Sequence, residues 1–171
     1  MPHPFKQPPR ALDRDGFVAR FGAVYEHSPW IAETVFEEGL TPRHDRPLGL
    51  HEAMKKAVEA SPRDRQLALL RAHPDLAGRL AMAGGLTVHS ASEQAGAGLD
   101  QCTPEEFSRF TALNDAYKMK FGFPFIMAVK GKSRGEILAA FETRSTNDAV
   151  SEFRAALDEV HKIALFRLRE L

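Results

Sequence analysis

The strongest constraint on the fold of this chain is a helical repeat that begins at Thr103-Pro104 and ends at Gly122. Within it the apolar side chains recur three or four positions apart and so share one helical face: Phe107, Phe110, Leu113, Tyr117 and Phe121. Threonine followed by proline is typical of a helix start, and glycine is typical of a helix end. The pattern predicts one long amphipathic helix.

The same signals recur along the chain. Ser28-Pro29 and Ser61-Pro62 each pair a capping side chain with a proline at the first helical position. Residues 133–136 have the Ser-x-x-Glu spacing of a capping box, and a long apolar repeat begins at 147–148 and runs towards the C-terminus. No strand pattern is extensive enough for a sheet. We therefore expect an all-α fold, a single compact domain of roughly seven to eight helices.

Size and charge narrow the class of protein. A chain of 171 residues, 43% hydrophobic, suits one domain, which we expect over residues 13–171, with residues 1–12 as a proline-rich extension on the surface. Lys and Arg number 23, as do Asp and Glu, so the charge favours a small-molecule partner over nucleic acid or an anionic membrane.

Cysteine content and hydropathy predict the compartment. Cys102 is the only cysteine, which excludes an internal disulfide framework and favours a reducing compartment. The N-terminus lacks a signal-peptide pattern, and no stretch approaches the ~18 apolar residues of a membrane span. We expect a soluble cytoplasmic protein.

His73 is the first candidate for a catalytic group. It precedes Pro74 at the end of an apolar helical pattern, and proline disfavours the α conformation in the residue before it. His73 should therefore end a helix and project from a bend. An imidazole titrates near neutrality, so in this position it is a candidate acid or base.

A second polar cluster lies in residues 90–99. Ser90 and Glu93 have capping-box spacing, which by itself favours a structural role at a helix start. The same turn also offers a hydroxyl, a carboxylate, the Gln94 amide and free backbone N–H groups to a polar ligand. The two interpretations are compatible.

The third candidate element is the apolar run of residues 123–129, which contains a proline. It is either a short buried extended segment or the broken start of a helix. Its phenylalanines are most simply core residues. An extended segment nevertheless leaves backbone N–H and C=O groups to be paired, and an amide-rich planar ligand can pair with them.

Taken together, four motifs resemble one known family. His-Pro-Asp-Leu-Ala-Gly at 73–78, Ser-x-x-Glu-Gln-x-Gly-Ala-Gly-Leu at 90–99, Leu-Asn-x-x-Tyr-x-x-Lys-Phe-Gly-Phe-Pro-Phe-Ile at 113–126 and the closing Glu-Val-x-Lys-Ile-Ala-x-x-Arg-Leu at 159–168 look like 2-oxo-4-hydroxy-4-carboxy-5-ureidoimidazoline (OHCU) decarboxylase. The resemblance covers about residues 15–171. It implies an all-helical enzyme, without metal or organic cofactor, that converts OHCU to (S)-allantoin and carbon dioxide. Family members are often homodimers, so it also implies a homodimer.

The resemblance also implies roles for individual residues. His73 matches the family's catalytic histidine, Glu93 its acidic partner, and Arg167 its arginine, with Arg144 as the alternative. The matching substrate-binding positions are Pro74, Ser90, Gln94, Phe125, Ile126, Met127, Ala128 and Val129. We expect His73 to handle protons, Glu93 and Gln94 to hold the ureido group, and Arg167 to orient the substrate.

Two other classes of function remain alternatives. A helical binding module that lost catalysis is one, although the presence of His73, Glu93 and Gln94 favours an active enzyme. The other is a metal-dependent phosphohydrolase built on His44-Asp45, which we disfavour because prolines on both sides predict a loop there.

The remaining singular residues receive structural interpretations. Cys102 is interpreted as a thiol without a catalytic role, since no histidine partner is evident, and Trp30 as a core residue. The other histidines outside these motifs are interpreted as surface residues: His3, His51, His89 and His161.

Overall fold

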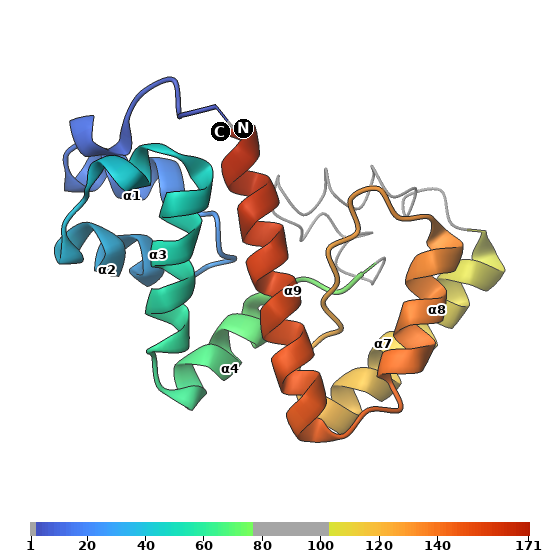
Figure 1. The fold of residues 1–171 in the computed structure, drawn as a ribbon. Coiled ribbons are helices and arrows are strands. Elements are labelled where there is room, and N and C mark those ends of the chain that lie inside the picture. The colour runs from blue at the N-terminus through green and yellow to red at the C-terminus, as the bar shows by residue number, and fades with distance from the viewer. Residues whose placement is uncertain (1–2, 77–102) are drawn as a thin grey trace. The chain divides into compact units, whose positions relative to one another are not determined.

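The computed structural model describes residues 3–76 and 103–171, and within them the chain is helical without any strand. The elements, labelled as in Figure 1, are η1 (Pro9–Ala11), α1 (Arg14–Phe21), α2 (Trp30–Glu38), η2 (Pro42–Asp45), α3 (Pro47–Glu59), α4 (Arg63–Ala72), α7 (Pro104–Phe121), α8 (Arg134–Arg144) and α9 (Ala149–Glu170). The predicted all-α class is confirmed. None of these helices combines the length and apolar composition that a membrane crossing needs.

Local signals placed the later helices correctly. The Thr103 hydroxyl accepts from the Glu106 N–H and the Glu106 carboxylate accepts from the Thr103 N–H, so α7 starts with a complete capping box. Residues 133–136 form the same box at the start of α8. Gly122 ends α7 in the left-handed conformation, with φ of 81°.

The expected caps at Ser28 and Ser61 are wrong in detail. The Ser28 hydroxyl donates to the carbonyl of Glu26, and the Ser61 hydroxyl donates to the carbonyl of Val58. Both helices do start near these serines. The hydroxyls close the preceding turn instead, because a serine can donate to a nearby carbonyl as readily as it accepts from an amide.

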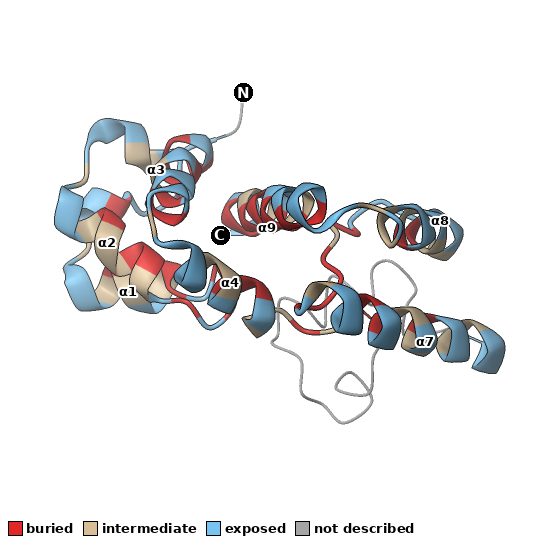
Figure 2. Ribbon diagram, turned by 90° about the horizontal axis from the view of Figure 1, so that it is seen from below, coloured by how far each residue is buried: buried red, intermediate tan, exposed pale blue. Residues whose placement is uncertain are grey.

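Contacts divide the chain into two compact units. Unit 1 comprises Met1–Leu69 and His161–Leu171, and unit 2 comprises Leu70–Val160. Each has its own buried residues, which are red on the ribbon of Figure 2. The expected site residues are therefore described unit by unit.

In unit 1, aromatic rings pack the first helices together. Phe17 and Phe21 of α1 are buried, with ring centroids 4.9 Å apart. Phe5 is buried against Phe21, and its N–H donates to the Asp45 carbonyl, so the proline-rich start is anchored rather than lying wholly on the surface. Trp30 is only half-buried, and the Arg65 guanidinium lies 4.6 Å from its ring.

In unit 2, α7 and α8 run side by side and bury facing aromatic rings (Figure 1). Tyr117 of α7 meets Phe141 of α8 edge to face, with centroids 5.9 Å apart. Phe125, from the segment between the two helices, stacks on Phe141 at 3.9 Å and 10°. The segment after α7 is thereby fixed against the core.

Candidate functional site

His73 lies one residue beyond the end of α4, as the proline after it predicts. Its N–H donates to the Leu70 carbonyl at 3.3 Å, which closes the last turn of the helix. The His73 side chain is half-buried, and Pro74 and Leu76 after it are buried. A bend anchored on both sides thus carries the candidate catalytic imidazole.

Helix α7 holds this bend through two polar side chains. The Asn114 amide nitrogen donates to the Leu76 carbonyl at 2.8 Å, and Asn114 is itself buried. One turn later on the same face, the Lys118 ammonium lies 3.2 Å from the Asp75 carboxylate. The His73 turn is therefore positioned by residues some forty positions further along the chain.

The end of α7 is tied to the same region. The Arg71 guanidinium, from the last turn of α4, donates through Nε to the Gly122 carbonyl at 2.9 Å. Gly122 is where α7 stops and the apolar segment begins. One helix consequently positions both the His73 turn and the start of residues 123–129.

Residues 123–129 form neither helix nor strand, and four consecutive members, Phe123 to Ile126, are buried. Of the two predicted alternatives, a buried non-helical segment is the one observed. Ala128 and Val129 are buried and Met127 is half-buried. In Figure 1 the segment is an elongated trace that connects the end of α7 to the start of α8.

Arg144, the less favoured candidate arginine, contacts this segment directly. Its guanidinium lies 4.4 Å from the Phe125 ring centroid, and Nη1 donates to the Ile126 carbonyl at 2.5 Å. Nε donates to the Glu152 carboxylate at 2.8 Å. Arg144 is thus engaged by backbone, ring and carboxylate at once.

Glu152 is completely buried and joins three side chains. Besides Arg144, its carboxylate accepts from the Tyr117 hydroxyl at 2.6 Å and from the Asn147 amide at 3.1 Å. Burial raises the pKa of Tyr117, and the Glu152 carboxylate raises it further, so the hydroxyl keeps its proton and remains a donor. A buried carboxylate needs such partners.

Arg167, the favoured candidate arginine, lies in unit 1 and is 1% exposed. Its Nη2 donates to the buried Glu26 carboxylate at 2.9 Å, and Nη1 donates to the Val24 carbonyl at 3.1 Å. These contacts give Arg167 a structural role in unit 1. Its role towards a substrate stays a prediction.

Three expected site residues, Ser90, Glu93 and Gln94, lie outside the described residues, as do His89 and Cys102. Their roles remain expectations from the sequence motif. In unit 2, the described part of the candidate site consists of the His73 turn and the segment after α7.

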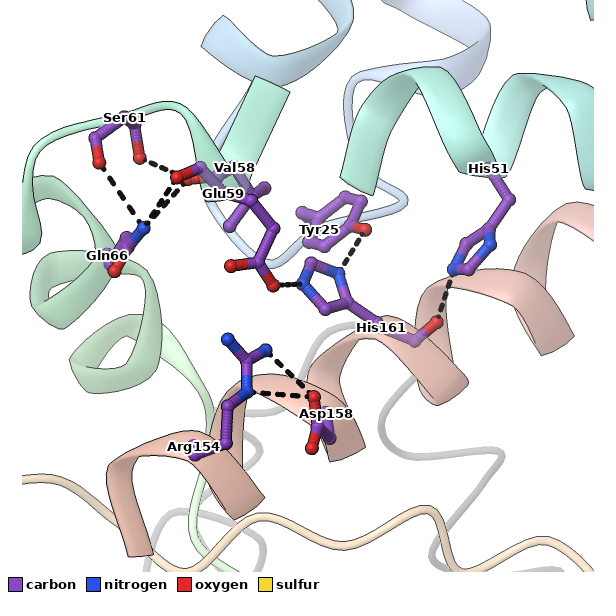
Figure 3. A network of polar contacts seen from close by, with 9 residues as sticks. All are labelled: Tyr25, His51, Val58, Glu59, Ser61, Gln66, Arg154, Asp158 and His161. Carbon is purple, nitrogen blue, oxygen red and sulfur yellow. Dashed lines mark hydrogen bonds and ion pairs between the residues drawn. The ribbon is translucent and has the colours of Figure 1, made fainter. Parts of the chain in front are cut away.

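A second polar cluster, which the sequence did not reveal, lies in unit 1 (Figure 3). The interpretation of His51 and His161 as surface residues is wrong, because they are 9% and 2% exposed. His161 Nδ1 is 2.8 Å from the Tyr25 hydroxyl, and Nε2 is 3.0 Å from the Glu59 carboxylate. His51 Nε2 is 2.8 Å from the main-chain carbonyl of His161.

The partners assign the tautomers. A carboxylate and a carbonyl only accept, so Nε2 carries the proton in both rings. His161 Nδ1 then accepts from the Tyr25 hydroxyl. Burial, the main cause, lowers the pKa of His161 from 6.5 to about 4, and it also lowers the pKa of His51. Both imidazoles are therefore neutral, and their contacts give this cluster a structural role.

The phosphohydrolase alternative receives no support from the described residues. His44 and Asp45 lie in η2, where His44 Nδ1 accepts from the Thr41 N–H and Asp45 pairs with Arg10. Within residues 3–76 and 103–171, no group of three or more His, Cys, Asp or Glu residues is arranged to hold a metal ion.

One helix of this all-helical fold fixes both a histidine-proline turn and a buried non-helical segment. Sequence comparison identifies the family. The chain belongs to the OHCU decarboxylase family, which it matches over residues 10–169.

Individual relatives agree with this assignment. The 2-oxo-4-hydroxy-4-carboxy-5-ureidoimidazoline decarboxylase of Haloferax volcanii is 48% identical over 163 residues, covering 93% of this chain and 90% of the relative. The protein of that name from Mus musculus is 36% identical, covering 94% and 89%.

Solved structures share the fold. A crystal structure of (S)-allantoin synthase matches with a TM-score of 0.74 and 32% identity over 94% of this chain, which spans only 51% of that longer chain. A crystal structure of OHCU decarboxylase in the presence of (S)-allantoin matches with a TM-score of 0.67 and 21% identity, covering 93% of this chain and 97% of that one.

Proposed function

We propose that this protein converts OHCU to (S)-allantoin and carbon dioxide, and that residues 13–171 form the catalytic domain. The supporting observation is that α7 fixes two family motifs together, the His73 turn through Asn114 and Lys118 and the apolar segment through the Gly122 end. The family match over residues 10–169 supports the same reaction.

The chemistry requires no external electron sink. When carbon dioxide leaves the hydroxyl-bearing carbon, the bonding pair forms a double bond to the ureido-bearing carbon, and the adjacent C=N accepts the displaced pair and a proton. The resulting enol then becomes a carbonyl as a proton adds to the ureido-bearing carbon. The face that receives this proton determines the configuration of allantoin.

The residue roles follow from position and chemistry. His73 handles the proton at the reacting carbons, since a neutral imidazole can both accept and donate. Glu93 and Gln94 hold the ureido group, assisted by Ser90, and Pro74 lines the site. Backbone groups of residues 125–129 pair with the ring amides. Arg167 orients the substrate through charge-assisted hydrogen bonds.

The test generates OHCU from urate in situ and follows optically active allantoin by circular dichroism. Wild-type protein should accelerate allantoin formation and give a single enantiomer, whereas His73→Asn should lower kcat by about 10²–10⁴-fold with the fold intact. Racemic product formed at the spontaneous rate with wild-type protein would refute the function. A His73→Asn variant with near-wild-type kcat would refute only the histidine's role.

We also propose, from the resemblance and the single cysteine, a cytoplasmic homodimer that works without metal or organic cofactor. Dialysis against a chelator should leave the rate unchanged, and sedimentation should give twice the 19.0 kDa chain mass. Loss of activity that a divalent metal restores would contradict the cofactor proposal.

A further inference from the structure

Two charged side chains of unit 2 bind the main chain of the segment after α7, two residues apart. Arg144 Nη1, at the end of α8, donates to the Ile126 carbonyl at 2.5 Å. The Glu159 carboxylate, on α9, accepts from the Ala128 N–H at 2.9 Å. The arginine donates to a main-chain carbonyl and the glutamate accepts from a main-chain N–H, so each charged side chain satisfies one backbone group.

The spacing of these contacts decides which edge of the segment they occupy. In an extended chain, the C=O of one residue and the N–H of the residue two further on point to the same side, and the residue between them points to the other side. Because the segment is elongated (Figure 1), this spacing assigns one edge to the contacts of Arg144 and Glu159 and the opposite edge to the Met127 N–H and C=O. No described residue hydrogen bonds to these two Met127 groups.

Arg144 is itself held rigidly. Its Nε donates to Glu152, which is 0% exposed and also accepts from Tyr117, and its guanidinium stacks over Phe125. This arrangement uses Nε and Nη1 of the guanidinium for groups of the protein itself.

Aromatic packing alone does not explain these contacts. The Phe125 stack on Phe141 fixes where the segment lies, but a ring stack leaves the peptide planes free to rotate about the chain. Ion contacts to one carbonyl and one amide set that rotation. The two ion contacts therefore determine where the peptide groups of the segment point.

We propose that Arg144 and Glu159 are positioning residues that turn the Met127 main-chain N–H and C=O towards the ureido and ring amide groups of the substrate. The inference rests on the proposed function and deepens it. It makes the orientation of one main-chain donor and one main-chain acceptor depend on two charged side chains, one at the end of α8 and one on α9.

The kinetic test uses Glu159→Ala and Arg144→Met, each purified and checked by thermal unfolding. Each should raise KM about tenfold or more, the size expected for loss of one hydrogen bond to a charged group, with a smaller change in kcat because His73 is untouched. Glu159→Gln should restore most of the wild-type KM, since its amide oxygen still accepts from the Ala128 N–H. Rescue of this kind separates a positioning role from the general effect of a charge.

Matched controls come from the exposed face of α9. Asp158→Ala and Arg154→Met break an exposed ion pair between neighbouring turns and should leave KM and kcat within about twofold. Wild-type protein in the same assay distinguishes failure of the proposed function from failure of the positioning role. An inactive wild type contradicts the proposed function, whereas an active wild type with unchanged KM in both test variants contradicts only the positioning role.

Amide hydrogen exchange supplies a readout without turnover, with (S)-allantoin as the probe. In wild-type protein the Ala128 amide should be protected without ligand, and allantoin should slow exchange at Met127 at least several-fold. Glu159→Ala should expose the Ala128 amide and weaken the protection at Met127. The proposal would be overturned if allantoin did not protect the Met127 amide in wild-type protein. It would also be overturned if allantoin protected that amide equally well in Glu159→Ala. Both results can be obtained even if the variant is too unstable for kinetics.

Discussion

Protonation of His161 should destabilise the protein between pH 6.5 and pH 4. The ring is 2% exposed, Nδ1 accepts from Tyr25 and Nε2–H donates to Glu59, and burial lowers its pKa to about 4. In the unfolded chain its pKa is near 6.5, so the unfolded state takes up the proton first. The stabilisation is therefore complete above pH 6.5 and decreases as the pH falls towards 4.

The magnitude follows from the two pKa values. Their difference, at about 1.4 kcal/mol per pH unit, corresponds to roughly 3 kcal/mol of unfolding free energy, a large share of the ~5–15 kcal/mol of a typical domain. His51, whose pKa burial also lowers, adds to the loss in the same direction. The Glu59 carboxylate favours the charged imidazole and so raises the pKa of His161, which reduces the loss of stability. Lys55 lowers this pKa, as burial does.

The assay is urea unfolding followed by circular dichroism at pH values from 4.5 to 7.5, on wild type and His161→Gln. Glutamine does not titrate, so the stability advantage of wild type over the variant should shrink by about 2–3 kcal/mol as the pH falls. His3→Gln, a change at an exposed histidine, serves as control and should run parallel to wild type. Parallel curves for His161→Gln and wild type would refute a neutral, buried His161.

Three further substitutions test the scaffold of unit 2 by the same urea measurement. Tyr117→Phe removes the donor to buried Glu152 and should cost about 1–3 kcal/mol; no loss would mean that the carboxylate does not depend on it. Thr103→Ala removes the α7 cap and should cost about 1 kcal/mol, and an unchanged midpoint would contradict the capping box. Gly122→Ala forces a side chain to φ 81° and should cost about 1 kcal/mol or more, so a stabilised variant would contradict the left-handed turn.

What could be predicted from the sequence was whatever depends on near neighbours in the chain. The long helix α7 was predicted with both ends, because Thr103, its capping glutamate and Gly122 act within a few residues of each other. The end of α4 at His73 was predictable for the same reason, since a proline restricts the residue directly before it. The expected cap at Ser28 failed because its hydroxyl could close either of two adjacent turns, and sequence does not rank them.

Residues whose partners are distant in sequence were misjudged. His161 is on a polar-looking stretch of α9, yet its ring partners lie 102 and 136 positions away. The contact of Arg144 with the Ile126 carbonyl likewise depends on how the segment after α7 returns past α8. One signal in the sequence could have suggested that these polar residues are buried. They recur at helical spacing on a face that also carries apolar residues.

The position of the single tryptophan has a practical consequence for watching this protein unfold. Trp30 lies in unit 1 with the Arg65 guanidinium over its ring, whereas unit 2, which carries His73, has no tryptophan in the sequence. Tryptophan fluorescence therefore reports on the unit that does not contain His73. Midpoints that differ between fluorescence and circular dichroism would reveal that the two units melt separately, and coincident midpoints would establish one cooperative transition.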